Sequence, residues 1–143
     1  MDKRVFRIVD ANLNRTREAL RVSEDIVRYL LEDRALTARL KRMRHDVTAT
    51  ISGLPRYRSR ILPMRSSRSD VGRPTSTRER RRRDVVDILF ANLERAKESL
   101  RVLEEFFKLF DAKGGERFKT LRYRLYEIEK AIAQRVESLP RPR

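Results

Sequence analysis

Residues 11–24 read ANLNRTREALRVSE and residues 91–104 read ANLERAKESLRVLE, so one segment occurs twice at a constant offset of 80 residues. Apolar residues in both copies recur at the three- and four-residue spacing of an amphipathic helix. A following segment also aligns, residues 40–44 over residues 118–122, at an offset of 78. A repeat of two helical segments predicts a duplicated helical hairpin, whose halves face each other about a pseudo-twofold axis.

The first half of the repeat, residues 2–51, is predicted to form two helices. Apolar residues recur at helical spacing up to Glu32, and Asp2 is suited to cap the first helix. Asp33 is suited to cap the second helix, which ends ahead of the Ser-Gly-Leu-Pro sequence at residues 52–55.

The second half, residues 76–139, repeats this arrangement. A capping box at residues 76–79 predicts the start of a third helix that runs to about Phe110. The Lys-Gly-Gly sequence at residues 113–115 is expected to break it before a fourth helix, which stops ahead of Pro140. The predicted fold is therefore all-α: a four-helix bundle with one long crossover loop.

That crossover, residues 52–75, follows neither the helical nor the strand period and contains three prolines and two glycines. A structureless connection of this length is uncommon in a compact domain and is typically either functional or disordered. The length of 143 residues favours a single helical domain over residues 1–143.

Composition excludes several kinds of site. The chain has no cysteine and one histidine, so neither a thiolate nor an imidazole zinc site can form. Four glycines in all weigh against a P-loop or a dinucleotide-binding fold. No segment has the apolar length of a signal peptide or a membrane span, so we expect a cytoplasmic protein with no membrane association.

Positive charge is concentrated around the crossover. Lys and Arg number 36 and Asp and Glu 21, a net charge of +15, and residues 52–83 hold eleven arginines against two acids, or +9 (11 minus 2). This excess indicates an anionic partner: nucleic acid, an acidic membrane surface or a small phosphorylated molecule. Residues 78–83, with five arginines, fit either a nucleic-acid stripe or the first turns of the third helix. Because Tyr57 is the only aromatic residue between 52 and 83, the stacking platform of single-strand binders is lacking, and nucleic acid is the less favoured partner.

Some polar residues repeat on or beside the predicted apolar faces. Asn12 and Asn92 fall near the centre of the face. Four arginines fall on its margins: Arg15, Arg44, Arg95 and Arg122. An arginine buried without a partner costs about 3–5 kcal/mol, so these need carboxylates such as Glu18 and Glu98, helix backbone or a bound anion. Two interpretations stay open: a polar layer that fixes helix register, or a basic, Asn-lined cavity that receives phosphate groups in two related half-sites.

Other repeated charges are expected on the solvent side of the helices. They are Arg21, Glu24, Arg101 and Glu104. Their spacing is typical of surface pairs three and four residues apart, and we interpret them as solvated charges.

Within the crossover, residues 65–73 read RSSRSDVGR, in which small residues let backbone amides approach an anion and arginines can bind it. Arg65 and Gly72 are candidate phosphate-binding residues on this basis. Asp70 is the lone acid of this run, so it is a candidate magnesium ligand, a candidate base toward a substrate hydroxyl, or an ion-pair partner.

Taken together, five segments resemble one family. They are residues 10–22, 70–72, 87–95, 98–105 and 121–127. The family is that of the small monofunctional hydroxymethylpyrimidine phosphate kinases, found alone or fused ahead of thiamine-phosphate synthase in bacteria, and the resemblance covers essentially the whole chain. One departure is that an acid usually follows the loop arginine in this family, whereas Ser66 follows Arg65 here, which shifts the expected metal role to Asp70.

The resemblance implies ATP-dependent phosphorylation of hydroxymethylpyrimidine monophosphate to the diphosphate in thiamine biosynthesis, with magnesium bridging the reacting phosphates. The partners would be the phosphorylated pyrimidine and a nucleotide. Phosphoryl transfer needs two phosphates held in line and their charge neutralised. We therefore expect the four repeated arginines to clamp phosphates, Asn12 and Asn92 to hydrogen-bond pyrimidine or phosphate, and Arg65, Asp70 and Gly72 to close over them.

An alternative is a non-catalytic basic helical domain that binds nucleic acid or thiamine-phosphate synthase. The sequence leaves open whether the chain is a monomer or a homodimer.

Overall fold

The computed structural model describes residues 2–52, 57–73 and 81–139. These residues form helices and loops and contain no strand. The elements are α1 (Lys3–Tyr29), α2 (Arg34–Ser52), α3 (Tyr57–Arg60), the 3-10 helix η1 (Leu62–Met64), α4 (Val85–Phe107) and α5 (Ala112–Glu137).

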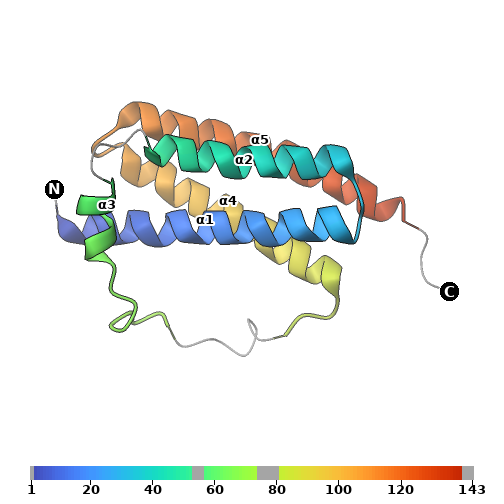
Figure 1. The fold of residues 1–143 in the computed structure, drawn as a ribbon, viewed down its shortest axis with the longest axis horizontal. Helices are drawn as coiled ribbons and strands as arrows, with labels where there is room; N and C mark the ends of the chain where they lie inside the picture. The colour runs from blue at the N-terminus through green and yellow to red at the C-terminus, as the bar shows by residue number, and fades with distance from the viewer. Residues whose placement is uncertain (1, 53–56, 74–80, 140–143) are drawn as a thin grey trace.

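The four long helices form the predicted all-α bundle. In Figure 1, α4 crosses behind α1 and α5 runs behind α2, and each helix packs on two neighbours. Figure 1 shows α1 and α4 running in opposite directions, and likewise α2 and α5, so the helix pairs that join the two hairpins are antiparallel. Thr16 contacts Ser99 between α1 and α4, and Asp46 contacts Arg124 between α2 and α5. The crossover therefore has to connect the end of α2 to the start of α4, at opposite ends of the bundle (Figure 1).

Small side chains line the crossing of α1 and α4, the most extensive helix pair of the bundle. The Thr16 hydroxyl donates to the Ser99 hydroxyl at 2.7 Å, and Ala19 and Ala96 are buried beside them. Small residues at such a crossing let two helix backbones approach closely. Around it, leucine, isoleucine, valine and phenylalanine side chains from all four helices form one hydrophobic core.

The predicted caps of the first two helices are confirmed. An oxygen of the Asp2 side chain accepts from the Arg4 amide at 2.9 Å, and the Asp33 side chain accepts from the Leu36 amide at 2.9 Å. Each carboxylate thus satisfies an amide that has no partner within the first helical turn.

The prediction for the start and end of the third helix is partly wrong. The capping box at residues 76–79 lies outside the described residues, but residues 81–84 are not helical and α4 begins at Val85. Asp84 caps it by accepting from the Asp87 amide at 2.8 Å. The arginines before Asp84 offer no apolar side chain to the core, so packing does not extend the helix through them. At its other end α4 stops at Phe107 rather than Phe110.

The crossover is also more structured than predicted. α2 continues through Ser52, and α3 and η1 form within the segment expected to lack structure. Ile61, between these two short helices, is buried in the core. One apolar side chain thereby anchors the crossover to the bundle.

The glycines at positions 114 and 115 do not break a helix as predicted. They lie in the first turn of α5, which Asp111 caps by accepting from the Gly114 amide at 3.0 Å. A Cβ atom on Gly114 would lie 2.6 Å from Cδ1 of Phe107, and one on Gly115 would lie 3.2 Å from the Glu104 carbonyl oxygen. The glycines therefore permit close packing of α5 on the end of α4.

Gly114→Ala is expected to lower the free energy of unfolding by about 1–3 kcal/mol, although alanine favours helix formation. The new methyl group overlaps Phe107, which is fully buried and has little room to move. Urea unfolding followed by circular dichroism measures the change. Gly72→Ala is the control, because a Cβ there meets only Asp70 Oδ1 at 3.5 Å. Equal stabilities of the two variants would contradict the packing argument.

Candidate functional site

One buried ion pair joins the two helices of each hairpin. Arg44 Nε lies 2.8 Å from Glu24 Oε2 between α2 and α1, and Arg122 Nη2 lies 2.8 Å from Glu104 Oε2 between α5 and α4. Glu24 is 2% exposed and Glu104 3% exposed, so the prediction that these two acids are solvated is wrong. Both acids are buried because the neighbouring helix supplies an arginine to each of them. The pattern of one helix taken alone does not show this partner.

These pairs belong to small networks. Arg101 also reaches Glu104 at 2.9 Å, and Arg122 donates to the Tyr126 hydroxyl at 2.7 Å. Burial acts to lower the pKa of Arg122, but its hydrogen bonds to Glu104 and Tyr126 outweigh burial and raise that pKa. The guanidinium groups of Arg44 and Arg122 are bound to carboxylates. Of the two interpretations, these arginines therefore fit a polar layer that fixes helix register rather than a phosphate clamp.

The repeated Asn and Arg pairs are arranged alike in both halves. Asn12 is buried and donates to the Ile8 carbonyl at 2.8 Å, and Asn92 is half-buried and donates to the Ile88 carbonyl at 2.8 Å. Arg15 and Arg95 are exposed, not buried as expected from the margin of an apolar face. Arg15 donates to Asn12 Oδ1 at 3.4 Å.

The carboxylates expected to pair with these two arginines do not do so. Glu18 and Glu98 are exposed, and within the described ranges neither Arg15 nor Arg95 makes an ion pair. Both arginines are therefore available to a bound anion.

An open groove of about 940 Å³ at the start of α4 brings three predicted residues together. It contains Asn92, Arg95 and Glu98 beside the arginine run that precedes the helix. Its lining comprises Arg81, Arg82, Arg83, Asp87, Phe90, Ala91, Asn92, Glu94, Arg95 and Glu98.

Two of the three acids in this groove are engaged by cations. Arg83 binds Asp87 with Nε to Oδ2 at 2.8 Å, and this hydrogen bond lowers the pKa of Asp87 to about 2. Glu94 lies 2.7 Å from Lys97 Nζ. The groove is thus an open, basic surface on which an anionic group of a ligand can meet Arg95.

Arg65 of the crossover binds Asp10 of α1, an acid that the sequence does not single out as a candidate site residue. Its Nε and Nη2 atoms donate to the two carboxylate oxygens of Asp10 at 2.7 and 2.9 Å, and Asp10 is 3% exposed. Nearby, Arg7 donates to the Ser66 carbonyl at 3.3 Å. The sequence signal for this contact is an acid between the apolar positions of α1 and an arginine directly after η1.

Asp70 and Gly72 lie on the exposed part of the crossover. Asp70 Oδ1 accepts from the Gly72 amide at 2.9 Å, which closes a tight turn. Across the described segments, no three His, Cys, Asp or Glu side chains are grouped so that they could hold a metal ion. One carboxylate together with substrate phosphates is nonetheless a common way to hold Mg²⁺, so the donor chemistry of Asp70 fits this ion. Neither Asp70 nor Gly72 lines the groove at α4.

None of the described helices combines the length and the apolar character of a membrane span.

The described residues form a bundle of two similar helical hairpins, with a basic groove at the start of α4. The sequence of the chain matches the model of the ThiD2 family over residues 7–131. The chain belongs to the ThiD2 family.

Its relatives are larger proteins. A thiamine-phosphate synthase of Synechocystis sp. is 41% identical over 129 residues, which cover 90% of this chain and 36% of the relative. A thiamine-phosphate synthase of Thermosynechococcus vestitus is 41% identical over 132 residues, and that of Rhodopirellula baltica is 33% identical over 136 residues. The chain spans about 36% of the length of each. No solved structure matches it.

The expected resemblance is confirmed at the level of this family. The relatives are named for the synthase rather than for a pyrimidine phosphate kinase.

Proposed function

We propose that this chain acts in thiamine biosynthesis as a kinase, which transfers a phosphoryl group from ATP to hydroxymethylpyrimidine monophosphate. The observation that carries the proposal is the groove at α4, where Arg95 lies beside Asn92 without an ion-pair partner in the described residues. Membership of a family whose relatives are thiamine-phosphate synthases supports the pathway.

In this proposal the groove binds the acceptor. Arg95 and Arg81 bind the phosphate that the acceptor already carries, because guanidinium groups form strong hydrogen bonds to phosphate oxygens. Asn92 uses one amide hydrogen on the Ile88 carbonyl, so its Oδ1 is left to accept from an amino group on the pyrimidine ring. An acceptor without phosphate would leave the arginines unpaired, which favours the monophosphate over the free pyrimidine.

The remaining predicted residues have supporting roles. Arg15 is the corresponding cation on α1 for phosphates of the nucleotide, and Asn12 positions it through Oδ1. Asp70 would hold the magnesium ion, which neutralises charge on the phosphates when bound. Arg65 holds the crossover on α1 through Asp10 and so positions the segment that carries Asp70.

The test is to incubate the full chain with hydroxymethylpyrimidine monophosphate, ATP and magnesium, and to follow the products by phosphorus NMR. New diphosphate resonances are expected with the monophosphate, and none with the unphosphorylated pyrimidine in a parallel tube. A folded sample that produces no diphosphate would overturn the proposal.

Arg95→Ala is expected to lower kcat/KM for the monophosphate by about 100-fold, the effect of losing one strong donor to a reacting phosphate group. A coupled assay of ATP consumption measures it. Arg17→Ala is the matched control, because Arg17 is also exposed but lies on α1 outside the groove. Unchanged thermal unfolding in both variants assigns the loss to binding or turnover. Full activity of Arg95→Ala would remove the groove as the acceptor site.

A second candidate function is an accessory domain that binds thiamine-phosphate synthase without catalysis. It is favoured by the relatives, in which the matched segment is about a third of a longer synthase. Mixing this chain with a thiamine-phosphate synthase and measuring the mass of the complex by light scattering tests it. Complex formation together with no diphosphate in the NMR assay would favour this candidate over the kinase.

A further inference from the structure

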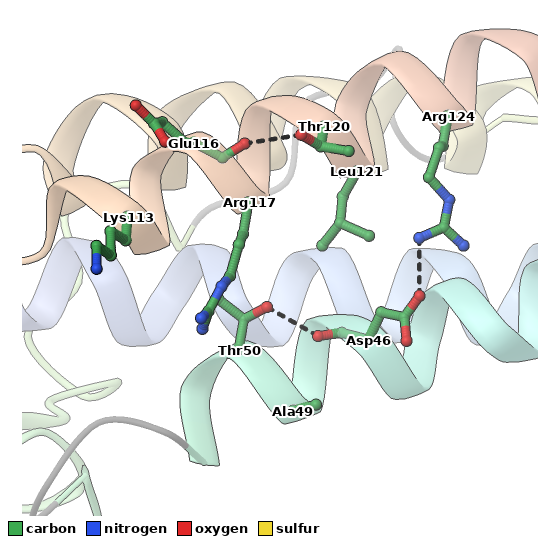
Figure 2. Close-up of a pocket in the computed structure, with 9 residues that line it drawn as sticks. All are labelled: Asp46, Ala49, Thr50, Lys113, Glu116, Arg117, Thr120, Leu121 and Arg124. Carbon is green, nitrogen blue, oxygen red and sulfur yellow. Dashed lines mark hydrogen bonds and ion pairs between the residues drawn. The ribbon is translucent and has the colours of Figure 1, made fainter.

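A separate groove lies between α2 and α5 (Figure 2). It has a volume of about 640 Å³, within the range of small-molecule sites, and shares no lining residue with the groove at α4. Its lining comprises Asp46, Ala49, Thr50, Lys113, Glu116, Arg117, Thr120, Leu121 and Arg124. The proposed kinase reaction uses none of these residues.

Among the residues that the structure describes, no carboxylate pairs with two of the cations in the groove. Arg124 binds Asp46 with Nη1 to Oδ2 at 2.8 Å. Lys113 and Arg117, by contrast, make no ion pair within the residues that the structure describes. Figure 2 shows the Arg117 side chain directed from α5 toward Thr50 of α2, whereas the Glu116 carboxylate points away from α2; Lys113 lines the groove one turn before Arg117. The positive charge is therefore on the side of α5 that faces the groove.

The spacing of these two cations lowers the stability of α5. Lys113 and Arg117 are four residues apart, so they share one face of α5, and like charges at this spacing repel and weaken a helix. A bound anion offsets the repulsion. The axial rise between them is about 6 Å, which suits a ligand with two or more phosphate groups better than a single carboxylate.

A neighbouring depression extends the groove along α5. It shares Thr120 and Arg124 with the groove and adds Lys119, Tyr123 and Glu127. Tyr123 is 55% exposed, so part of its ring is open to a planar group. A nucleotide carries such a group, its base, joined to the phosphates through ribose, whereas free pyrophosphate carries none.

We propose that the groove between α2 and α5 is a second anion site, which binds the polyphosphate group of a nucleotide or free pyrophosphate through Lys113 and Arg117. The proposal does not depend on the kinase reaction, because the two grooves have no residue in common.

The experiment titrates the full, ¹⁵N-labelled chain with sodium pyrophosphate and, separately, with ATP, and follows amide resonances by NMR at constant ionic strength. Saturable shifts are expected at residues 46–50 and 113–124. In Lys113→Gln/Arg117→Gln we expect the affinity for pyrophosphate to fall at least tenfold. Both substituted side chains are exposed, so thermal unfolding should stay unchanged and report that the variant is folded.

The matched control is Arg39→Gln/Arg42→Gln, which removes the same charge from exposed positions of α2 that do not line the groove. This variant should bind pyrophosphate as the parent does. An equal loss of affinity in both double variants would show general attraction to a basic protein and overturn the proposal. Shifts confined to residues 81–98 would overturn it too.

The two ligands separate the possible sources of the anion. If ATP binds more tightly than pyrophosphate and also shifts the ring proton resonances of Tyr123, recorded in proton spectra of the same samples, the site takes a nucleotide. If pyrophosphate binds as tightly as ATP and Tyr123 does not respond, the site takes the free polyphosphate. Either result supports the site, and no saturable binding of either ligand refutes it.

Discussion

Glu24→Gln is expected to lower the free energy of unfolding by about 3 kcal/mol, a large share of the stability of a small domain. The substitution removes the charge that Arg44 faces at 2.8 Å, while Glu24 itself is almost inaccessible to water. Because Arg44 keeps part of its surface in solvent, we place the effect at the lower end of the range for a broken buried pair. Urea unfolding monitored by circular dichroism measures it.

Two further variants separate charge from packing. Glu24→Leu/Arg44→Met replaces both partners by apolar side chains and should recover most of the lost stability, since no charge is then left unpaired. Glu18→Gln changes an exposed carboxylate on the same helix and should shift stability by no more than about 0.5 kcal/mol. If the double variant is less stable than Glu24→Gln, the unpaired charge of Arg44 does not explain the loss. The ion pair itself then contributes to the free energy of unfolding.

Phe107→Ala is expected to cost about 4 kcal/mol. Phe107 is fully buried at the end of α4, and its ring centroid lies 4.7 Å from both Phe110 and Phe118. Its removal leaves a cavity where the start of α5 packs on α4, a region in which the close approach at Gly114 limits collapse. The same unfolding experiment, at low temperature so that the variant is folded without urea, measures the loss.

Phe106→Ala provides the comparison for this prediction. It removes the same ring from the preceding residue of α4, which is half-buried rather than fully buried. Its cost should be clearly smaller, because less apolar surface returns to water. Equal costs at the two positions would mean that the aromatic cluster does not hold the end of the bundle together.

The fold was largely predictable because its main determinant is periodic. The repeated segments place leucine and valine at helical spacing in both halves, and this pattern alone predicts four amphipathic helices in two hairpins. Asp2 and Asp33 mark two helix starts correctly, since a cap acts on amides within the next turn. Such signals are local and can be found without knowledge of tertiary contacts.

The errors arose where tertiary contacts decide the local structure. Glycines 114 and 115 resemble a helix breaker, yet they are needed for close contact with Phe107 and Glu104 of another helix. Ile61 packs in the hydrophobic core, and it lies between α3 and η1, two short helices that the sequence of the crossover does not predict. In each case the partner lies in a different element of the bundle.

The candidate site was predictable only where a residue's place on its own helix decides its surroundings. The repeated Asn and Arg pairs, with Asn92 and Arg95 in a groove, follow from their place on the helix. The burial of Glu24 and Glu104 depends on arginines in the neighbouring helices, and that of Asp10 depends on Arg65 in the crossover. A helical wheel shows only its own helix, so it assigns Glu24 and Glu104 to solvent and gives no partner for Asp10.

The hydroxyl contact between Thr16 and Ser99 has a consequence for the kinetics of folding. It joins residues 83 positions apart in the chain, within the most extensive helix pair, whereas each hairpin closes through a turn of only four residues, 30–33 or 108–111. Forming a contact across a long chain segment costs more entropy than closing a short turn. We therefore expect each hairpin to close faster than the two hairpins dock on each other.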